Sequence, residues 1–312
     1  MRFVSFATPE LPTPHLGLVR GGEVLDVDLA GQVLNVRVPD QMQELIENYE
    51  RYLPGLQALL TRAGERRLSE VKAFSDTGIA HKLEAVELAA PLPRPRKNVL
   101  CVGLNYSEHV RETAEVRGRS AEPPSEPVFF TKAPTSVNGP YGTIGIDPAV
   151  SSEIDWEAEL AAIIGKTCKN VSEEEALQCV FGYTVLNDVT ARDLQARHKQ
   201  FFKGKSLDGS CPMGPWIVTA DELPDPQHLD IALRVNGVVK QQANTSQMVF
   251  SIARLISVLS QGMTLEPGDI LATGTPSGVG FSRTPPEFLK AGDVMETEVE
   301  GIGILRNPVV QR

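Results

Sequence analysis

Hydrophobic and polar positions divide the chain into many short strands with few helices between them. Apolar alternation or short apolar runs predict strands over residues 99–102, 127–131, 154–164, 183–186 and 270–272, with two more between 293 and 305. Glycine-containing turns predict hairpins over residues 15–27 and 231–239. The strands show no regular alternation with helices, which argues against a doubly wound parallel sheet.

Helical spacing is confined to a few segments. We expect one helix after Asp40, which is its predicted N-cap, and another after Pro54. A capping box at Ser172 should open a short helix that ends near Gly182. The strongest helical stripe predicts a helix over residues 246–261.

A Pro-rich, basic stretch over residues 91–97 has the composition of a linker. It predicts a small N-terminal α+β domain over residues 1–92 and a catalytic domain over residues 97–312. The N-terminal segment contains no obvious ligand chemistry. We therefore expect it to be a cap or an oligomerisation domain.

Composition narrows the class of protein. A net charge of −10 repels phosphate backbones, so nucleic acid is not an expected partner. The chain has four cysteines but no CxxC pair, which argues against a structural zinc site and fits reduced thiols in the cytoplasm. No signal peptide and no apolar run of membrane-spanning length is visible, so a membrane partner is not expected either.

Three carboxylates form the most informative group. Glu157 and Glu159 lie two residues apart in a predicted strand, so their side chains should share one face, and Asp188 follows the next apolar run. Three oxygen ligands suit Mg²⁺, Mn²⁺ or Ca²⁺ and suit zinc or copper poorly. The alternative is an acidic strand face turned toward water, because Glu153 and Asp155 share the alternation.

Two further groups are candidates for proton transfer or charge stabilisation. His109 and Glu112 are three residues apart, so in a helix they would be neighbours, and a carboxylate beside an imidazole makes a usable general base. The alternative is an exposed charged pair. Lys205 lies in a loop bounded by glycines and a proline, where it could stabilise an enolate or remain a solvated lysine.

The glycine-rich loop over residues 273–280 is neither a P-loop nor a nucleophile elbow, because the required lysine and serine spacings are missing. Its backbone amides and the Thr275 hydroxyl could meet an anion such as a carboxylate. The alternative is a tight turn between strands.

Together these segments resemble the fumarylacetoacetate hydrolase family, from about Lys97 to the end of the chain. The matching stretches are residues 102–112, 127–132, 155–160, 187–195, 204–212 and 273–280. The resemblance implies an α+β fold, a mixed β-sandwich roll with few helices, which is usually dimeric. A homodimer is therefore expected.

The resemblance also assigns roles to residues. It implies that Mg²⁺ or Mn²⁺ is held by Glu157, Glu159 and Asp188, with Glu153 and Asp155 left as outer or solvent groups. It implies that the catalytic groups are His109, Glu112 and Lys205. It implies that the substrate pocket is lined by Lys132, Arg192, Gln195 and Thr275.

The implied substrates are 2-oxo acids, β-diketones and their enols, such as acylpyruvates, oxaloacetate or 2-hydroxyhepta-2,4-dienedioate. An enolate formed at the metal leads to C–C bond hydrolysis, decarboxylation or keto–enol isomerisation, and the sequence does not choose among them. The alternatives are a 2-oxo acid hydratase or dehydratase of the same superfamily, or a binding protein without catalytic activity. A small 2-oxo dicarboxylate or an acylpyruvate is favoured, because Lys132, Arg192 and Lys205 add positive charge to an acidic protein.

Overall fold

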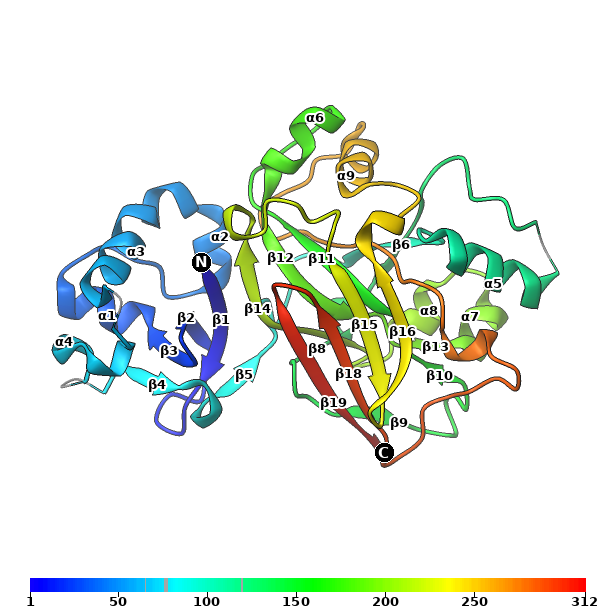
Figure 1. Cartoon of the computed structure of the whole chain (residues 1–312), viewed down its shortest axis with the longest axis horizontal. Helices are drawn as coiled ribbons and strands as arrows, with labels where there is room; N and C mark the ends of the chain where they lie inside the picture. The colour runs from blue at the N-terminus through cyan, green and yellow to red at the C-terminus, as the bar shows by residue number, and fades with distance from the viewer. Residues whose placement is uncertain (65, 76–77, 119) are drawn as a thin grey trace.

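The computed structural model describes residues 1–64, 66–75, 78–118 and 120–312 (Figure 1). The strands are β1 (Arg2–Ala7), β2 (His15–Arg20), β3 (Glu23–Asp26), β4 (Ala80–Lys82), β5 (Glu87–Ala89), β6 (Val99–Gly103), β7 (Val128–Lys132), β8 (Val137–Asn138), β9 (Ile144–Ile146), β10 (Ile154–Asp155), β11 (Ala158–Ile164), β12 (Val180–Asn187), β13 (Thr190–Ala191), β14 (Cys211–Thr219), β15 (Asp230–Val235), β16 (Val238–Asn244), β17 (Ile270–Ala272), β18 (Val294–Val299) and β19 (Gly303–Gln311). The helices are α1 (Val27–Leu34), α2 (Met42–Glu47), α3 (Tyr49–Ala63), α4 (Lys72–Ser75), α5 (Ser107–Arg117), α6 (Glu173–Ala176), α7 (Arg192–His198), α8 (Phe202–Lys205) and α9 (Ile252–Ser260).

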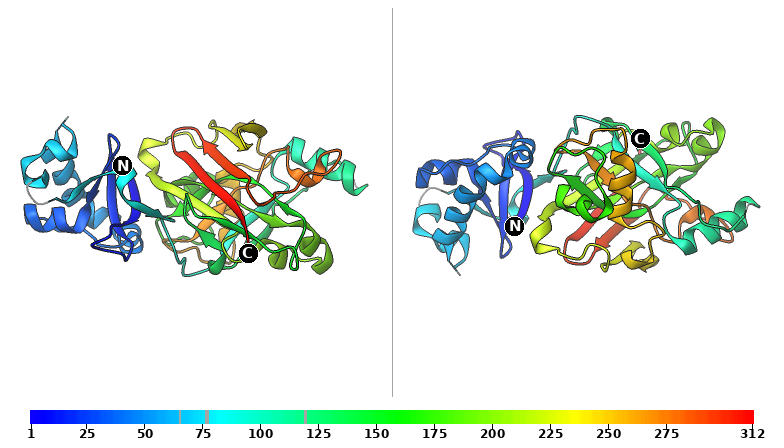
Figure 2. Two further views of the ribbon diagram at one scale, coloured as in Figure 1. Left: turned by 90° about the horizontal axis from the view of Figure 1, so that it is seen from below. Right: turned by 90° about the horizontal axis from the view of Figure 1, so that it is seen from above.

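The largest sheet in the described part of the chain runs from the N-terminal region into the larger body of the molecule. Its strand order is β4-β3-β2-β1-β14-β12-β11-β17-β6-β7, with β5 on β1 and β8 on β14. The link is the antiparallel pairing of β1 with β14, where Arg2 lies opposite Val218. Figures 1 and 2 show the N-terminal part at one end of an elongated molecule. The domain boundary expected at residues 92–97 stays a prediction. The largest sheet contains strands from both sides of this boundary.

A second sheet packs on the larger one to form the main core. Its strand order is β16-β15-β18-β19-β9. Leu160 and Val185, from β11 and β12, share one buried cluster with Leu233 and Leu305, from β15 and β19. Side chains from two facing sheets thus exclude water between them, as in a β-sandwich. The expected α+β fold with several sheets is confirmed.

Both predicted hairpins are present. β2 pairs with β3 around Gly21 and Gly22, and β15 pairs with β16 around Asn236 and Gly237. Asn236 has a φ of 53° and Gly237 a φ of 77°, the positive values that a type I′ turn requires. Local turn chemistry therefore sets these two registers.

Helix boundaries depart from the predictions where tertiary contacts intervene. Asp40 does not cap α2, and its carbonyl oxygen instead accepts a hydrogen bond from the Leu16 N–H (2.9 Å). Pro54 lies inside α3 and does not precede a separate helix. The longest predicted helix begins only at Ile252, because the Ser251 side chain accepts from the Arg254 N–H and caps it there.

The helix expected after Ser172 is shorter than predicted. The capping box is present, but α6 ends at Ala176, and a 3₁₀ turn to Cys179 leads directly into β12.

All four cysteines are buried and unpaired. None of the helices in the described ranges combines the length and the apolarity that crossing a bilayer requires.

Candidate active site

The strand predicted over residues 154–164 is two strands, β10 and β11, interrupted at Trp156 and Glu157. At the interruption the Glu157 N–H donates to the Asn187 side-chain oxygen (3.0 Å). The Asp188 N–H in turn donates to the Glu157 carbonyl oxygen (2.8 Å). These two bonds place Glu157 opposite Asp188, where β11 and β12 run side by side.

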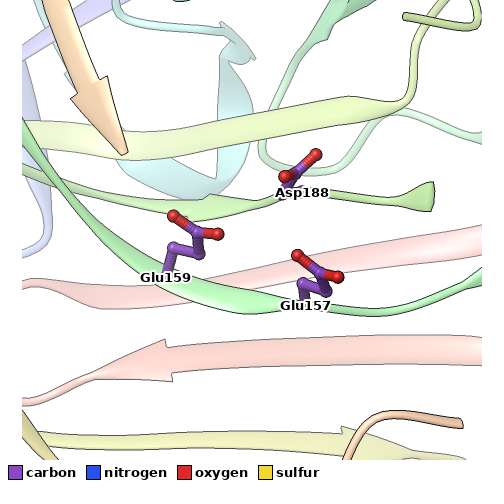
Figure 3. A group of neighbouring side chains, drawn as sticks. All are labelled: Glu157, Glu159 and Asp188. Atoms are coloured by element: carbon purple, nitrogen blue, oxygen red, sulfur yellow. The ribbon is translucent and has the colours of Figure 1, made fainter. Parts of the chain in front are cut away.

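Glu159 in β11 faces Glu157, directly before β11, and Asp188, directly after β12 (Figure 3). One carboxylate oxygen from each lies within 4.8 Å of the others. Glu157 is 5% exposed, Glu159 1% and Asp188 0%. Asp155 is buried as well. The alternative of an acidic face turned toward water is therefore wrong.

The electrostatics of this triad fit a divalent cation. Burial raises the pKa of Glu159 well above its ordinary value, and the neighbouring carboxylates of Asp188 and Glu157 raise it further. Asp188 Oδ1 is buried and forms no hydrogen bond, although Lys132 Nζ lies 2.7 Å away as an ion-pair partner. Three carboxylate oxygen donors close to one another are the donor set that a hard divalent cation prefers.

Lys205 is joined to the triad and is not the solvated loop lysine of the alternative reading. It lies at the end of α8 and is 2% exposed. Its ammonium donates to Glu157 Oε2 and to Asp188 Oδ2, both at 2.7 Å. Burial would lower the pKa of Lys205, but Asp188 and Glu157 outweigh burial and raise it. Lys205 therefore stays a cation, suited to stabilising an oxyanion and unsuited to acting as a base.

Arg192 bridges two buried carboxylates and keeps one donor free. Its Nε donates to Asp155 (2.8 Å), and its Nη1 lies 2.7 Å from Glu157 Oε1. Burial would raise the pKa of Glu157, but Lys205 and Arg192 outweigh burial and lower it to about 2. The Nη2 of Arg192 is buried without a hydrogen-bond partner, and Arg192 is one of the residues that line the cavity.

The predicted His–Glu pair is formed in helix α5. His109 Nδ1 lies 2.7 Å from Glu112 Oε1, and His109 is only 6% exposed, so the alternative of an exposed pair is wrong. Glu112 Oε2 accepts from the Gly278 N–H and the Ser282 hydroxyl, each at 2.9 Å. Because Glu112 faces Nδ1, Nε2 is the nitrogen left for proton transfer.

The loop over residues 273–280 uses its amides on the protein's own carboxylates. The Gly274 N–H donates to Glu159 Oε2 (2.8 Å), just as Gly278 donates to Glu112. These two amides are therefore not free for a ligand anion, contrary to the expectation from sequence. Thr275 Oγ1 accepts from Gln241 Nε2 (2.8 Å).

A cavity of about 770 Å³ opens beside these groups. Its lining includes His109, Glu157, Arg192, Gln195, Lys205 and Thr275. Lys132 does not line it. Lys132 is fully buried, where its ammonium meets Asp188 and donates to the Val189 carbonyl oxygen (3.1 Å). The structure thus places Lys132 as a support for Asp188, apart from the other predicted pocket residues.

Asp155 plays a part in the site that its sequence context did not indicate. Besides Arg192, this carboxylate accepts from the backbone N–H groups of Trp156 (2.8 Å), Gly280 (2.7 Å) and Phe281 (3.0 Å). It joins Arg192 to the segment that holds Glu112. Its place in the alternating acidic run was the only sign of this part in the sequence. Residues 280 and 281 are too far away along the chain for the contact to be predicted from local spacing.

Comparisons with known proteins agree with this geometry. The family model described as fumarylacetoacetate (FAA) hydrolase C-terminal matches residues 98–310. Oxaloacetate tautomerase YisK of Bacillus subtilis (strain 168) is 42% identical over 310 residues, which cover 98% of this chain and 100% of that protein.

Two solved structures cover the whole chain. Fumarylacetoacetate hydrolase (EaFAH) from Exiguobacterium antarcticum is 39% identical with a TM-score of 0.79, and 100% of both chains is covered. Maleylpyruvate hydrolase from Sphingobium sp. SYK-6, in complex with manganese(II) ion and pyruvate, is 32% identical with a TM-score of 0.74, covering 100% of this chain and 99% of that one. Because the family model and a relative of more than 40% identity both extend over most of its length, this chain is an enzyme of the fumarylacetoacetate hydrolase family.

Proposed function

We propose that the protein catalyses the keto–enol tautomerisation of oxaloacetate or a closely related 2-oxo dicarboxylate. The observation that carries this proposal is the buried triad of Glu157, Glu159 and Asp188, whose Glu157 lines the same cavity as His109 of the His109–Glu112 pair. The full-length similarity to a protein named oxaloacetate tautomerase supports the choice of reaction.

Glu157, Glu159 and Asp188 would hold Mg²⁺ or Mn²⁺, and Ca²⁺ could bind the same oxygen donors. When bound there, such a cation polarises the 2-oxo group and lowers the free energy of the enolate. Lys132, through its ion pair with Asp188, keeps that carboxylate in place.

His109 moves the proton. In ketonisation the enol oxygen loses its proton and carbon 3 gains one, so a group that can both hold and release a proton is needed beside carbon 3. His109 lines the cavity, and its Nε2 is left free by Glu112. Glu112 fixes the tautomer and stabilises the imidazolium that forms.

The remaining side chains orient the substrate. The free Nη2 of Arg192 is a donor for the carboxylate beside the 2-oxo group. Lys205 contributes positive charge where the oxyanion develops. Gln195 and Thr275 line the same cavity and add neutral polar contacts.

C–C bond hydrolysis is the second candidate, favoured by the solved maleylpyruvate hydrolase that contains manganese and pyruvate. The same His109 could take a proton from water and not from carbon. Product analysis separates the two reactions, because hydrolysis releases two acids and tautomerisation changes no C–C bond.

The test is a panel of oxaloacetate, acetylpyruvate, fumarylpyruvate and a 2-hydroxymuconate-type dienoate, assayed in EDTA and after Mn²⁺ is added back. We expect Mn²⁺-dependent decay of the oxaloacetate enol. Glu159→Gln should abolish it, and His109→Ala should retain Mn²⁺ binding by calorimetry while turnover falls at least about 100-fold. Normal turnover by the His109→Ala protein would refute the proton-transfer role.

We further propose that the enzyme is a cytoplasmic homodimer in which residues 1–92 form a cap or an oligomerisation domain. Four unpaired, buried cysteines support a reducing compartment. Sedimentation of the full chain tests the dimer, for which a monomer at micromolar concentration would be the contrary result.

A further inference from the structure

One face of helix α7 forms a wall of the cavity. Arg192, Gln195 and Ala196 line it at the spacing i, i+3 and i+4 that puts residues on one side of a helix, and Lys199, directly after the helix, lines it as well. Arg192 is buried and Lys199 is exposed, so this wall runs from the floor of the cavity to its mouth.

Lys199 is the cation at the mouth. It follows the last residue of α7 and has a φ of 61°, a conformation that residues other than glycine adopt infrequently. Arg192 and Lys205 also line the cavity, but both are engaged by buried carboxylates. Within the described ranges no carboxylate lies at ion-pair distance from Lys199, although Glu122 is another lining residue.

The charges at the floor leave no cation for a second carboxylate. Four buried carboxylates there face three buried cations: Asp155, Glu157, Glu159 and Asp188 against Lys132, Arg192 and Lys205. The floor therefore carries one net negative charge. A bound divalent cation would change this to one net positive charge, which the carboxylate of a 2-oxo acid neutralises. A second carboxylate in the cavity would then be unpaired, and burying an unpaired charge is costly.

We infer that Lys199 binds the far carboxylate of the substrate and so selects dicarboxylates over 2-oxo acids with an uncharged end. This inference rests on the proposed function and names the substrate class more narrowly. The Cα atoms of Arg192 and Lys199 are separated by about 10 Å along the helix, at about 1.5 Å per residue. Both residues line one cavity, so the long, flexible Lys199 side chain can extend toward a ligand held at Arg192.

The charge of the surrounding segment adds a long-range electrostatic attraction. Residues 192–205 contain five Lys or Arg residues and a single acid, Asp193, in a chain whose net charge is −10. Three of the five, Arg197, Lys199 and Lys203, are exposed, and exposed positive charge beside a cavity attracts dianions from solution. This effect is independent of a specific contact, so the experiment must separate the two.

The experiment compares two unreactive ligands in the presence of Mg²⁺ by isothermal titration calorimetry. N-oxalylglycine carries a far carboxylate, and N-isobutyloxamate carries an uncharged group of similar shape. Lys199→Met removes the charge and keeps much of the stem, and Lys199→Gly removes the charge while relieving the positive φ. Lys203→Met is the matched control, because Lys203 is exposed in the same basic segment and does not line the cavity.

We expect wild-type protein to prefer N-oxalylglycine, and both Lys199 variants to weaken this preference by about two- to fivefold, the range for a partly exposed ion pair. Lys199→Arg should retain it. The inference is overturned if the wild type has no preference, if it binds neither compound, or if Lys203→Met weakens the preference as much as Lys199→Met. Failure of the proposed function would be seen separately, as absent oxaloacetate turnover with this binding pattern intact.

Discussion

Asp155→Asn should destabilise the protein although the two side chains have the same size and shape. Asp155 is fully buried and accepts from Trp156, Gly280, Phe281 and Arg192. An asparagine can keep one carbonyl oxygen toward the first two donors. Its NH₂ group would then face the Phe281 N–H and Arg192 Nε, which are both donors.

The magnitude follows from these contacts. Two hydrogen bonds to a charged acceptor are lost, each worth about 1.5–3 kcal/mol. Arg192 keeps its ion pair with Glu157, so it is not left unpaired, and we take the lower end of the range, about 3 kcal/mol. The same change releases the segment that holds Glu112, so turnover should fall as well.

Urea unfolding followed by tryptophan fluorescence measures this loss, in EDTA so that metal binding does not contribute. The m-value should be unchanged, since the same surface is exposed on unfolding. Glu153→Gln is the matched control, an acid two positions away that is only half-buried, and it should change stability by less than about 0.5 kcal/mol. A loss below about 1 kcal/mol for Asp155→Asn would refute the argument.

Two further changes test the site. Because the pKa of Glu159 is raised by burial and by Asp188 and Glu157, its ionisation costs stability. That cost is absent below the unfolded pKa near 4.5 and grows as the pH rises toward the folded pKa. Metal-free Glu159→Gln should therefore unfold at a higher temperature than wild type at pH 7, with the order reversed by Mg²⁺; a less stable variant in EDTA would contradict this. Ser282→Ala removes one donor to Glu112 and should lower kcat by about three- to tenfold while KM stays unchanged. The acid limb of the kcat–pH profile should shift as well. A change in KM alone would argue against a positioning role for Ser282.

Features with short-range causes were predictable from the sequence. The turn at Asn236 and Gly237 requires only its own backbone preferences. The His109–Glu112 contact needs only a helix, since the two residues are three apart. The spacing of Glu157 and Glu159 likewise predicted that they would face the same way.

Other features were decided by contacts between distant segments. Helix α9 begins at Ile252 and not at Ser246, because the N–H groups of Val249 and Phe250 donate to Asn105, far away in the sequence. Lys132 carries no local sign that it would be buried beneath Asp188 and not exposed in the cavity. Asp155 could not be distinguished from a solvent-facing acid until residues 280 and 281 were seen to donate to it.

The sequence by itself determined which chemical groups are present and which neighbours share a face, because backbone geometry repeats over a few residues. Only the tertiary structure decided which of those groups are buried, which charges are paired and which remain free for a ligand. Glu112 shows the difference: its bond to His109 spans three residues, whereas its bond to Gly278 spans 166. Burial and charge compensation depend on strand pairing across the whole sheet, and they set whether a carboxylate or a lysine is a solvent group or a part of the site.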